Sequence, residues 1–159
     1  NELSRAAGVA LSPITGGPSV NESLETNIPG VFAAGNVLHV HDLVDYVSEE
    51  AGAAGEHAAA YILKSEHAAG RTLPVRCENG VRYTVPTAIR PDCAGDTVTL
   101  RFRVGGVYKN KKIAVYLGDT CIFSRRRPVL APGEMETVRL KSDLLRGAGD
   151  AVTVTLEEG

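Results

Sequence analysis

The hydrophobic pattern of this chain changes near Gly70, and that change limits what the chain can fold into. An Ala-rich segment from about Leu43 to Lys64 has strong helix propensity. Beyond Gly70, apolar Val, Tyr and Ile alternate with polar residues, which is typical of half-buried antiparallel strands. We therefore expect an α+β chain with two domains, a helical one over residues 1–70 and an all-β one over residues 71–159.

Charge is divided unevenly between the two expected domains. Residues 1–70 carry 2 Lys/Arg and 9 Asp/Glu, whereas residues 71–159 carry 15 and 10, although the net charge of the chain is only −2. This asymmetry favours two separate units. No stretch approaches the roughly 18 consecutive apolar residues of a membrane helix, so we expect a cytoplasmic protein without a membrane span. The chain begins at Asn1 rather than Met, so we expect a processed or engineered fragment.

Six strands are expected beyond Gly70, most of them separated by turns that contain Gly. They are Val81–Val85, Thr97–Val104, Lys112–Leu117, Thr120–Ser124, Glu136–Leu140 and Ala151–Leu156. Their spacing is usual for a small β-sandwich, and we expect an immunoglobulin-like one. The three cysteines are widely spaced and form no C-x-x-C pair, so we expect reduced thiols that are buried or half-buried.

The first domain is expected to contain a hairpin, a buried strand and a helix. A short helix over Glu2–Ala7 should end at Gly8, because Gly adopts the left-handed conformation at little cost. Val9–Leu11 can pair with Ser19–Val20 across a turn rich in Pro and Gly. Val31–Ala34 is a short apolar run, as expected of a parallel strand buried on both faces.

The most informative segment is Thr26–Val37, which reads TNIPGVFAAGNV. A strand that ends in Gly35 lets the backbone approach an extended ligand, and Asn36 beside it can hydrogen-bond a hydroxyl. The helix that follows directs its N-terminal amides at an anionic or electron-rich group. Gly52 and Gly55 inside that helix each cost about 1 kcal/mol relative to Ala, so they predict close approach to another backbone or a ligand.

The order of Thr26, Pro29-Gly30, an apolar strand, Gly35 and a small-residue helix resembles the second FAD signature of the pyridine nucleotide-disulfide oxidoreductase family. The resemblance spans about residues 1–65. It implies that this part is the end of a Rossmann-type FAD-binding domain. The family's usual aspartate is here Asn36, which can both accept and donate a hydrogen bond to a hydroxyl.

The resemblance also implies which residues bind the cofactor. Gly35 and Asn36 would contact the ribityl-phosphate portion of FAD, and Val37 would add its amide. Val44 and Asp45 are the candidates for the residues against the isoalloxazine. No residue of this chain is assigned a catalytic role.

By this resemblance the parent protein is an FAD-dependent oxidoreductase, an NAD(FAD)-dependent dehydrogenase that passes hydride or electrons between NAD(P), flavin and an acceptor. The chain has no G-x-G-x-x-G loop for either dinucleotide. We therefore expect the chain alone to be inactive and not to retain FAD, with N-terminal dinucleotide-binding domains or a partner subunit supplying the rest. The absence of C-x-x-C and the expected β-sandwich argue against disulfide reduction.

A different class of function also fits the sequence, namely a non-catalytic β-sandwich module for interaction or assembly, with residues 1–70 as a docking arm. An apolar strand at Val31–Ala34 without its neighbours predicts a homo-oligomer or a rearranged N-terminal segment. The basic residues Lys109, Lys111, Lys112 and Arg125–Arg127 are expected to protect a strand edge or to dock on acidic groups. No recognition motif supports nucleic-acid binding.

His39, His41 and Asp42 are a possible metal-binding group. Two imidazoles two residues apart with a carboxylate can chelate an ion, but a zinc-type site needs further ligands, and the nearby sequence marks none. We therefore expect no metal here. The sharper expectation is that this loop lines the flavin or a subunit contact.

Overall fold

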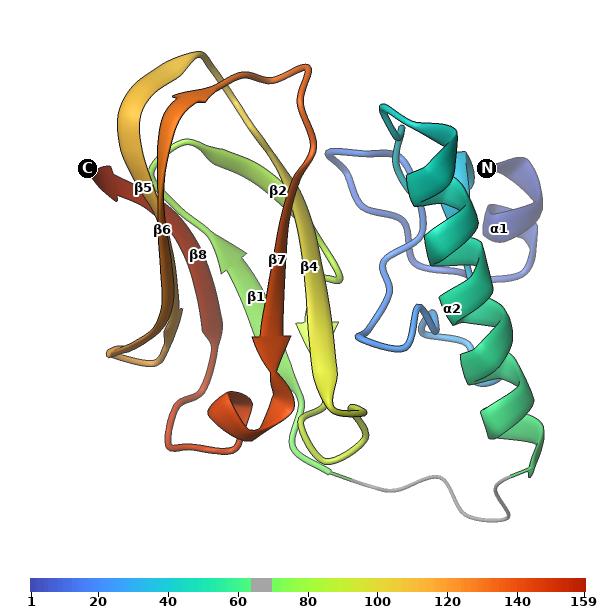
Figure 1. Cartoon of the computed structure of the whole chain (residues 1–159). Coiled ribbons are helices and arrows are strands. Elements are labelled where there is room, and N and C mark those ends of the chain that lie inside the picture. Colours follow the sequence, from blue (N-terminus) through green and yellow to red (C-terminus); the bar gives the residue numbers. More distant parts are fainter. Residues whose placement is uncertain (64–69) are drawn as a thin grey trace. The chain divides into compact units, whose positions relative to one another are not determined.

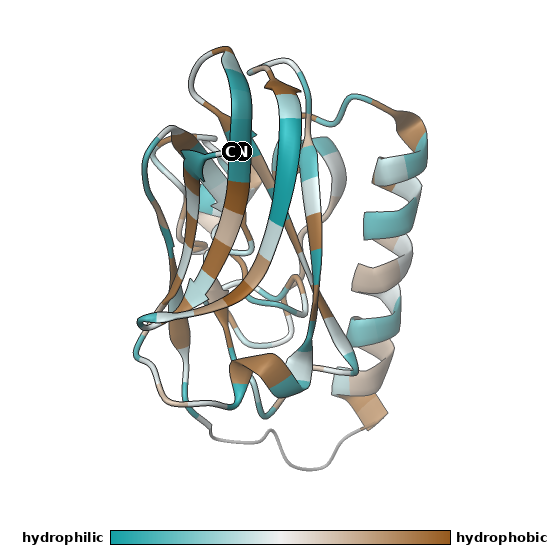
Figure 2. Ribbon diagram, turned by 60° about the vertical axis from the view of Figure 1, so that its left-hand side comes forward, coloured by the Kyte–Doolittle hydropathy of each residue, from teal (hydrophilic) through white to brown (hydrophobic). Residues whose placement is uncertain are grey.

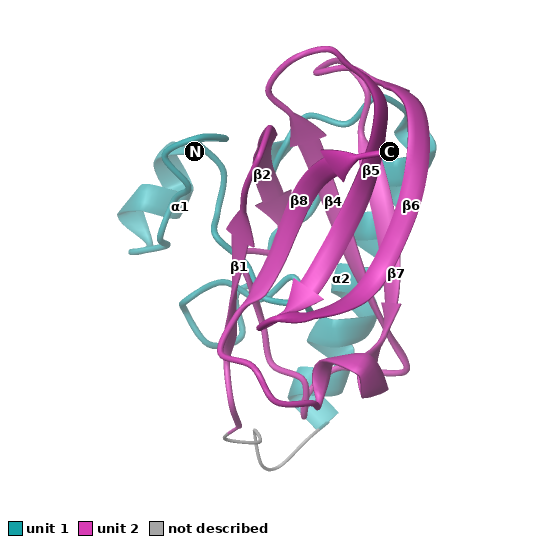
Figure 3. Ribbon diagram, turned by 90° about the vertical axis from the view of Figure 1, so that its left-hand side faces the viewer, with its two compact units in different colours: residues 1–69 teal, residues 70–159 magenta. Residues whose placement is uncertain are grey.

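The computed structural model describes residues 1–63 and 70–159, and the chain divides into two compact units, Asn1–Ala69 and Gly70–Gly159 (Figures 1 and 3). The first unit contains α1 (Glu2–Ala6), the 3-10 helix η1 (Gly35–Val37) and α2 (Val44–Leu63). The second unit is built mainly of strands. The chain is therefore a mixed α+β structure dominated by sheets, and the division falls where the hydrophobic pattern changes.

The second unit has two sheets. Its strands are β1 (Leu73–Cys77), β2 (Val81–Val85), β3 (Ala88–Ile89), β4 (Thr97–Val104), β5 (Tyr108–Leu117), β6 (Thr120–Leu130), β7 (Glu136–Lys141) and β8 (Val152–Glu158), with the 3-10 helix η2 (Ser142–Leu145) before β8. One sheet has the order β3-β1-β8-β5-β6, and the other has the order β2-β4-β7. The β1–β8 pair is parallel, whereas β5 runs antiparallel to both of its neighbours.

All six strands expected from the alternation are present, and β5, β6, β7 and β8 extend beyond their expected ends. Two strands were missed. Strand β1 contains Pro74, which weakens a strand signal, and β3 has only two residues. The second half of β6 was also missed, because the charged run Arg125–Arg127 interrupts the alternation of apolar and polar residues. Strand β6 lies at the edge of its sheet, where these charges were expected.

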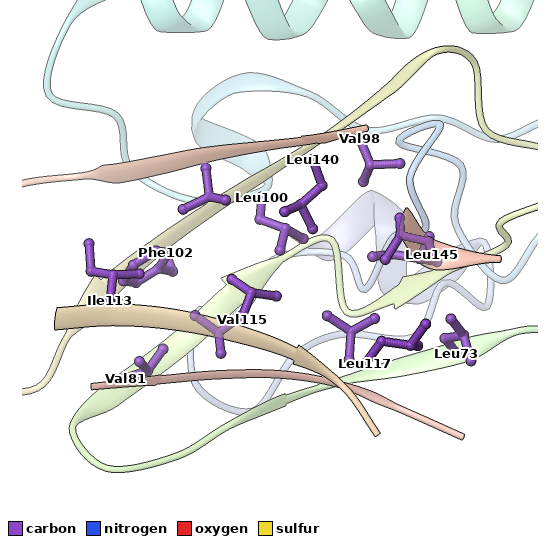
Figure 4. Packing of buried hydrophobic residues seen from close by; sticks show 14 of the residues in the cluster. Leu73, Val81, Val98, Leu100, Phe102, Ile113, Val115, Leu117, Leu140 and Leu145 are labelled. Atoms are coloured by element: carbon purple, nitrogen blue, oxygen red, sulfur yellow. The ribbon is translucent and has the colours of Figure 1, made fainter. Parts of the chain in front are cut away.

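The core of the second unit lies between the two sheets (Figure 4). Along β4, Val98, Leu100, Phe102 and Val104 are all at most 2% exposed. Residues two apart point to the same face of a strand, so these four side chains cover one face of the smaller sheet. Strand β5 supplies Ile113, Val115 and Leu117 from the larger sheet. Figure 2 shows hydrophobic and hydrophilic residues following one another along the strands.

Truncating the centre of this core should destabilise the second unit strongly. Phe102 is 0% exposed, so Phe102→Ala should lower the free energy of unfolding by about 3–5 kcal/mol. The control is Val107→Ala, because Val107 is 68% exposed and should change stability by less than about 0.5 kcal/mol. Urea unfolding followed by circular dichroism measures both. Equal effects of the two substitutions would contradict this packing.

Turns and side-chain hydrogen bonds hold the first unit together. Gly8 ends α1 with φ +77°, as expected. The expected hairpin is present in a short form, with one antiparallel bridge between Leu11 and Pro18 and a hydrogen bond from the Ser19 N–H to the Ala10 carbonyl at 2.8 Å. The Asn27 side chain accepts the Ala10 N–H at 2.7 Å and donates to the Gly8 carbonyl at 3.1 Å, so it fixes this segment.

The expected parallel strand at Val31–Ala34 is wrong for this chain. Phe32 forms a single antiparallel bridge with Glu25, and the Ala33 N–H donates to the Leu24 carbonyl at 3.0 Å. Val31 is 37% exposed. A parallel strand needs a parallel neighbour, and the described residues of the first unit contain no other strand with which this segment could pair in that way.

Helix α2 runs from Val44 to Leu63, one residue inside each expected end, and Lys64 itself lies outside the described residues. It contacts the preceding loop through Tyr61, whose ring meets Phe32 edge to face at a centroid distance of 6.0 Å. Neither α2 nor any other helix within residues 1–63 and 70–159 is long and apolar enough to cross a membrane.

The cysteines form no disulfide. Cys77 and Cys121 are exposed, contrary to expectation. Cys121 lies near the start of the edge strand β6, where several side chains face solvent, so this small apolar side chain is exposed as well.

Several basic residues of β5 and β6 have acidic partners within the second unit. Lys112 forms an ion pair with Glu157 at 2.7 Å, so part of this positive charge is neutralised there.

Candidate functional site

Two imidazoles and one carboxylate meet inside the first unit. His39 and His41 lie in the loop between η1 and α2, and Glu50 lies within α2. The Nε2 atom of His39 is 3.2 Å from Oε2 of Glu50, and the Nε2 atom of His41 is 3.0 Å from Oε1. All three side chains are at most 1% exposed. They form a buried cluster that we call the His-Glu-His cluster.

The turn before the cluster directs the loop inward. Gly35 has φ +73°, a left-handed conformation that favours glycine. Its carbonyl accepts the N–H of Leu38 at 2.9 Å, and Leu38 is only 1% exposed. A Cβ atom at Gly17 would lie 2.0 Å from the Leu38 carbonyl oxygen. Close packing on Gly17 therefore fixes where the loop carrying His39 and His41 begins.

The Glu50 carboxylate joins three parts of the chain. Its Oε1 atom accepts the Gly35 N–H at 2.7 Å as well as the His41 contact, while its Oε2 atom meets His39. Burial alone raises the pKa of Glu50, but the hydrogen bonds from His39, His41 and the Gly35 amide, with the charge of His39, hold that pKa below its ordinary value. The ionised carboxylate thus ties the Gly35 turn and the loop to α2.

Sequence reasoning missed Glu50, and the observation that marks it comes from the structure. Ala54 is buried on α2, and a residue four positions earlier lies on the same helix face. That residue is Glu50, which follows Glu49 and precedes the small residues Ala51–Gly55. A buried acid requires partners, and the two histidines upstream are the available ones.

Three of the expected FAD contacts form one turn. Gly35 is buried and its N–H is bound by Glu50, whereas Asn36 is exposed and Val37 is 44% exposed. The Asn36 Oδ1 atom accepts the backbone N–H of His41 at 3.2 Å. The Asn36 side chain is therefore held in place on the surface.

The other two expected contacts, Val44 and Asp45, occupy the first turn of α2 and are both exposed. The turn packs beside this end of the helix, since a Cβ atom at Gly35 would lie 3.2 Å from the Val47 side chain. The structure thus brings all five residues to one region of the first unit.

The His-Glu-His cluster bears on the expectation that the loop carrying His39 and His41 lines the flavin or a subunit contact. The imidazoles of His39 and His41 face the interior, with ring centroids 4.5 Å apart. Val40 between them is 66% exposed. Of these three residues, Val40 is the one placed to contact a ligand or another chain.

The second unit has a polar hollow of about 370 Å³, lined in part by Arg76, Asn79, Tyr116 and Glu157. The Tyr116 hydroxyl donates to Glu157 at 2.5 Å, and this hydrogen bond raises the pKa of Tyr116 to about 12. Because these two groups satisfy each other, we assign no ligand to the hollow.

Comparison of the chain with protein-family models, with curated proteins and with solved structures finds no match.

Replacing the central carboxylate should loosen the first unit. In Glu50→Gln the amide nitrogen faces N–H groups that the carboxylate oxygens accepted, so we expect a loss of about 2 kcal/mol in unfolding free energy at neutral pH. Glu56→Gln, at an exposed position on the same helix, is the control and should change little. Thermal unfolding followed by circular dichroism, with a chelator present, measures the difference.

The cost of Glu50→Gln should also depend on pH. Because the folded pKa of Glu50 lies below its unfolded value, its stabilising contribution is fully present above about pH 4.3, the ordinary glutamate value, and is lost as the pH falls through the folded pKa. The difference between wild type and Glu50→Gln should therefore shrink on acidification. A difference that grows at low pH would contradict the assignment of an ionised carboxylate.

Proposed function

We propose that the first unit supplies one wall of the FAD-binding site of a flavin-dependent oxidoreductase, and that residues outside this chain supply the dinucleotide-binding loops. The parent enzyme passes hydride or electrons between a nicotinamide cofactor, FAD and an acceptor. In this proposal the first unit is the end of a Rossmann-type domain, and the second unit is an immunoglobulin-like sandwich used in assembly.

One observation carries the proposal: the exposed side chains of the Gly35–Val37 turn are held against the exposed start of α2 by a buried carboxylate. Preorganised contacts of this kind lower the cost of ordering a binding surface. The Asn36 amide can meet ribityl hydroxyls as both donor and acceptor. The first N–H groups of an α-helix have no partner within the helix, so the start of α2 can offer donors to an electron-rich atom, although the Tyr46 N–H already donates to the Leu43 carbonyl at 3.2 Å.

The charge at the start of α2 favours one end of the cofactor. Asp45 lies in the first turn and is exposed. Its carboxylate would repel a phosphate at that position, but it does not prevent a neutral carbonyl oxygen from approaching the helix amides. This supports the pyrimidine end of the flavin beside α2 and the pyrophosphate elsewhere.

Apolar side chains near the turn also support a covered surface. Val37, Val40, Leu43 and Val44 are 44%, 66%, 55% and 78% exposed. Four exposed apolar residues within eight positions are more than the scattered single residues of an ordinary surface. A flat isoalloxazine ring and the missing domains would cover them.

Restoring the missing domains tests the proposal. Co-expression of this chain with the upstream part of its gene should yield a yellow protein with flavin absorbance at roughly 450 nm. Asn36→Ala should lower the flavin retained per chain several-fold, because ribityl hydrogen bonds are lost. Ser48→Ala, an exposed change on α2, is the control. A colourless complex would instead favour the interaction module.

The helix glycines give a second test. A Cβ atom at Gly52 or Gly55 would meet nothing within 4 Å, so the close neighbour expected from the sequence is not in the described part of this chain. Gly52→Ala should stabilise the isolated chain by about 0.5–1 kcal/mol. If the neighbour belongs to the missing domains, the same change should weaken their association. Unchanged association, measured by titration with the upstream domains, would show that Gly52 approaches nothing there.

A further inference from the structure

We propose that the His-Glu-His cluster is a binding site for a divalent transition-metal ion of the zinc type, with Nε2 of His39, Nε2 of His41 and the Glu50 carboxylate as ligands. This site is separate in its chemistry from four of the proposed flavin contacts, Asn36, Val37, Val44 and Asp45, which are exposed; the fifth, Gly35, is buried and donates its N–H to Glu50. The inference does not require FAD binding.

The separations suit a single ion. The ligand atoms of the three residues all lie within 4.8 Å of one another. The two distances from imidazole Nε2 to carboxylate oxygen, 3.2 Å and 3.0 Å, are close to the roughly 3.3 Å between neighbouring ligands of a tetrahedral zinc ion with bonds of about 2.0–2.1 Å. The two contacts use different oxygens of the carboxylate, so an ion between the two imidazoles would be held by one or both of these oxygens.

The ligand set also selects the ion. Imidazole nitrogen suits zinc and its transition-metal neighbours rather than calcium or magnesium, which prefer oxygen ligands. Two His and one carboxylate are a set found around zinc ions that keep a fourth position for water. The three side chains are at most 1% exposed, so any fourth ligand would have to be small, such as water.

The contacts with Glu50 use the Nε2 atoms of the two imidazoles and leave their Nδ1 atoms for other partners. Nδ1 of His41 is buried and has no hydrogen-bond partner among the residues that the structure describes. When a neutral imidazole that donates from Nε2 takes up a metal there, its proton moves to Nδ1, and the imidazole loses no proton.

The sequence supports a local site. His39 and His41 are separated by one residue, and Glu50 follows nine positions after His41. All three ligands therefore come from one loop and the helix that it enters, within the first unit. An ion at this position would tie the loop to α2 more firmly than the hydrogen bonds alone.

The test uses the 159-residue chain stripped of metal with a chelator, incubated with excess zinc sulfate, desalted and analysed by mass spectrometry for zinc. We expect one zinc per chain and a thermal midpoint several degrees higher than in the stripped protein. Cobalt(II) in place of zinc should give visible d–d bands without a thiolate charge-transfer band, which distinguishes this site from the exposed Cys77 and Cys121.

Variants locate the ion. His41→Ala and His39→Gln should each lose the bound zinc and the thermal shift. His57→Ala should keep both, because His57 lies on α2 and is not a member of the cluster. Zinc retained equally by wild type and by His41→Ala would overturn the proposal. Wild type that retains no zinc would overturn it as well, and that result does not depend on whether a variant folds.

Discussion

The first unit depends on one buried carboxylate. Glu50 accepts hydrogen bonds from the Gly35 backbone and from two imidazoles, and these three donors come from a turn and a loop that have little other regular structure. Because an unpaired buried charge is costly, the turn, the loop and the helix must adopt their positions together. The geometry of the surface around Asn36 follows from this constraint.

The same constraint separates an inner face from an outer one. Inside, His39 and His41 direct nitrogen atoms at the Glu50 carboxylate, and these groups are the proposed ligands of a zinc-type ion. Outside, Asn36, Val40 and Val44 remain exposed beside the start of α2. A ligand on the outer surface and an ion in the interior would stabilise the same loop from its two sides, so the two proposals are compatible and independently testable.

Much of the fold follows from the sequence because its signals are local. Period-two alternation identified β2 and β4 with their observed ends, and Ala content identified α2. The apolar run at Val31–Ala34 was misassigned, because its pattern does not reveal whether partner strands are present. The five expected FAD contacts were named from a resemblance, and the structure brings them together without testing their role.

Glu50 was missed for a different reason. A helix of small residues does not show which face is buried until its neighbours are known, and the partners of Glu50 lie in a loop with no periodicity. The burial of Ala54 supplies that face only once the structure is seen.

The most direct measurement of the central claim is amide hydrogen exchange on this chain assembled with the dinucleotide-binding domains that the proposal requires, with and without FAD. The account predicts slower exchange on FAD binding in the turn at residues 35–37 and in the first turn of α2, with little change in the strands of the second unit. Exchange in both of those segments that is unaffected by FAD would contradict the claim that this surface contacts the cofactor.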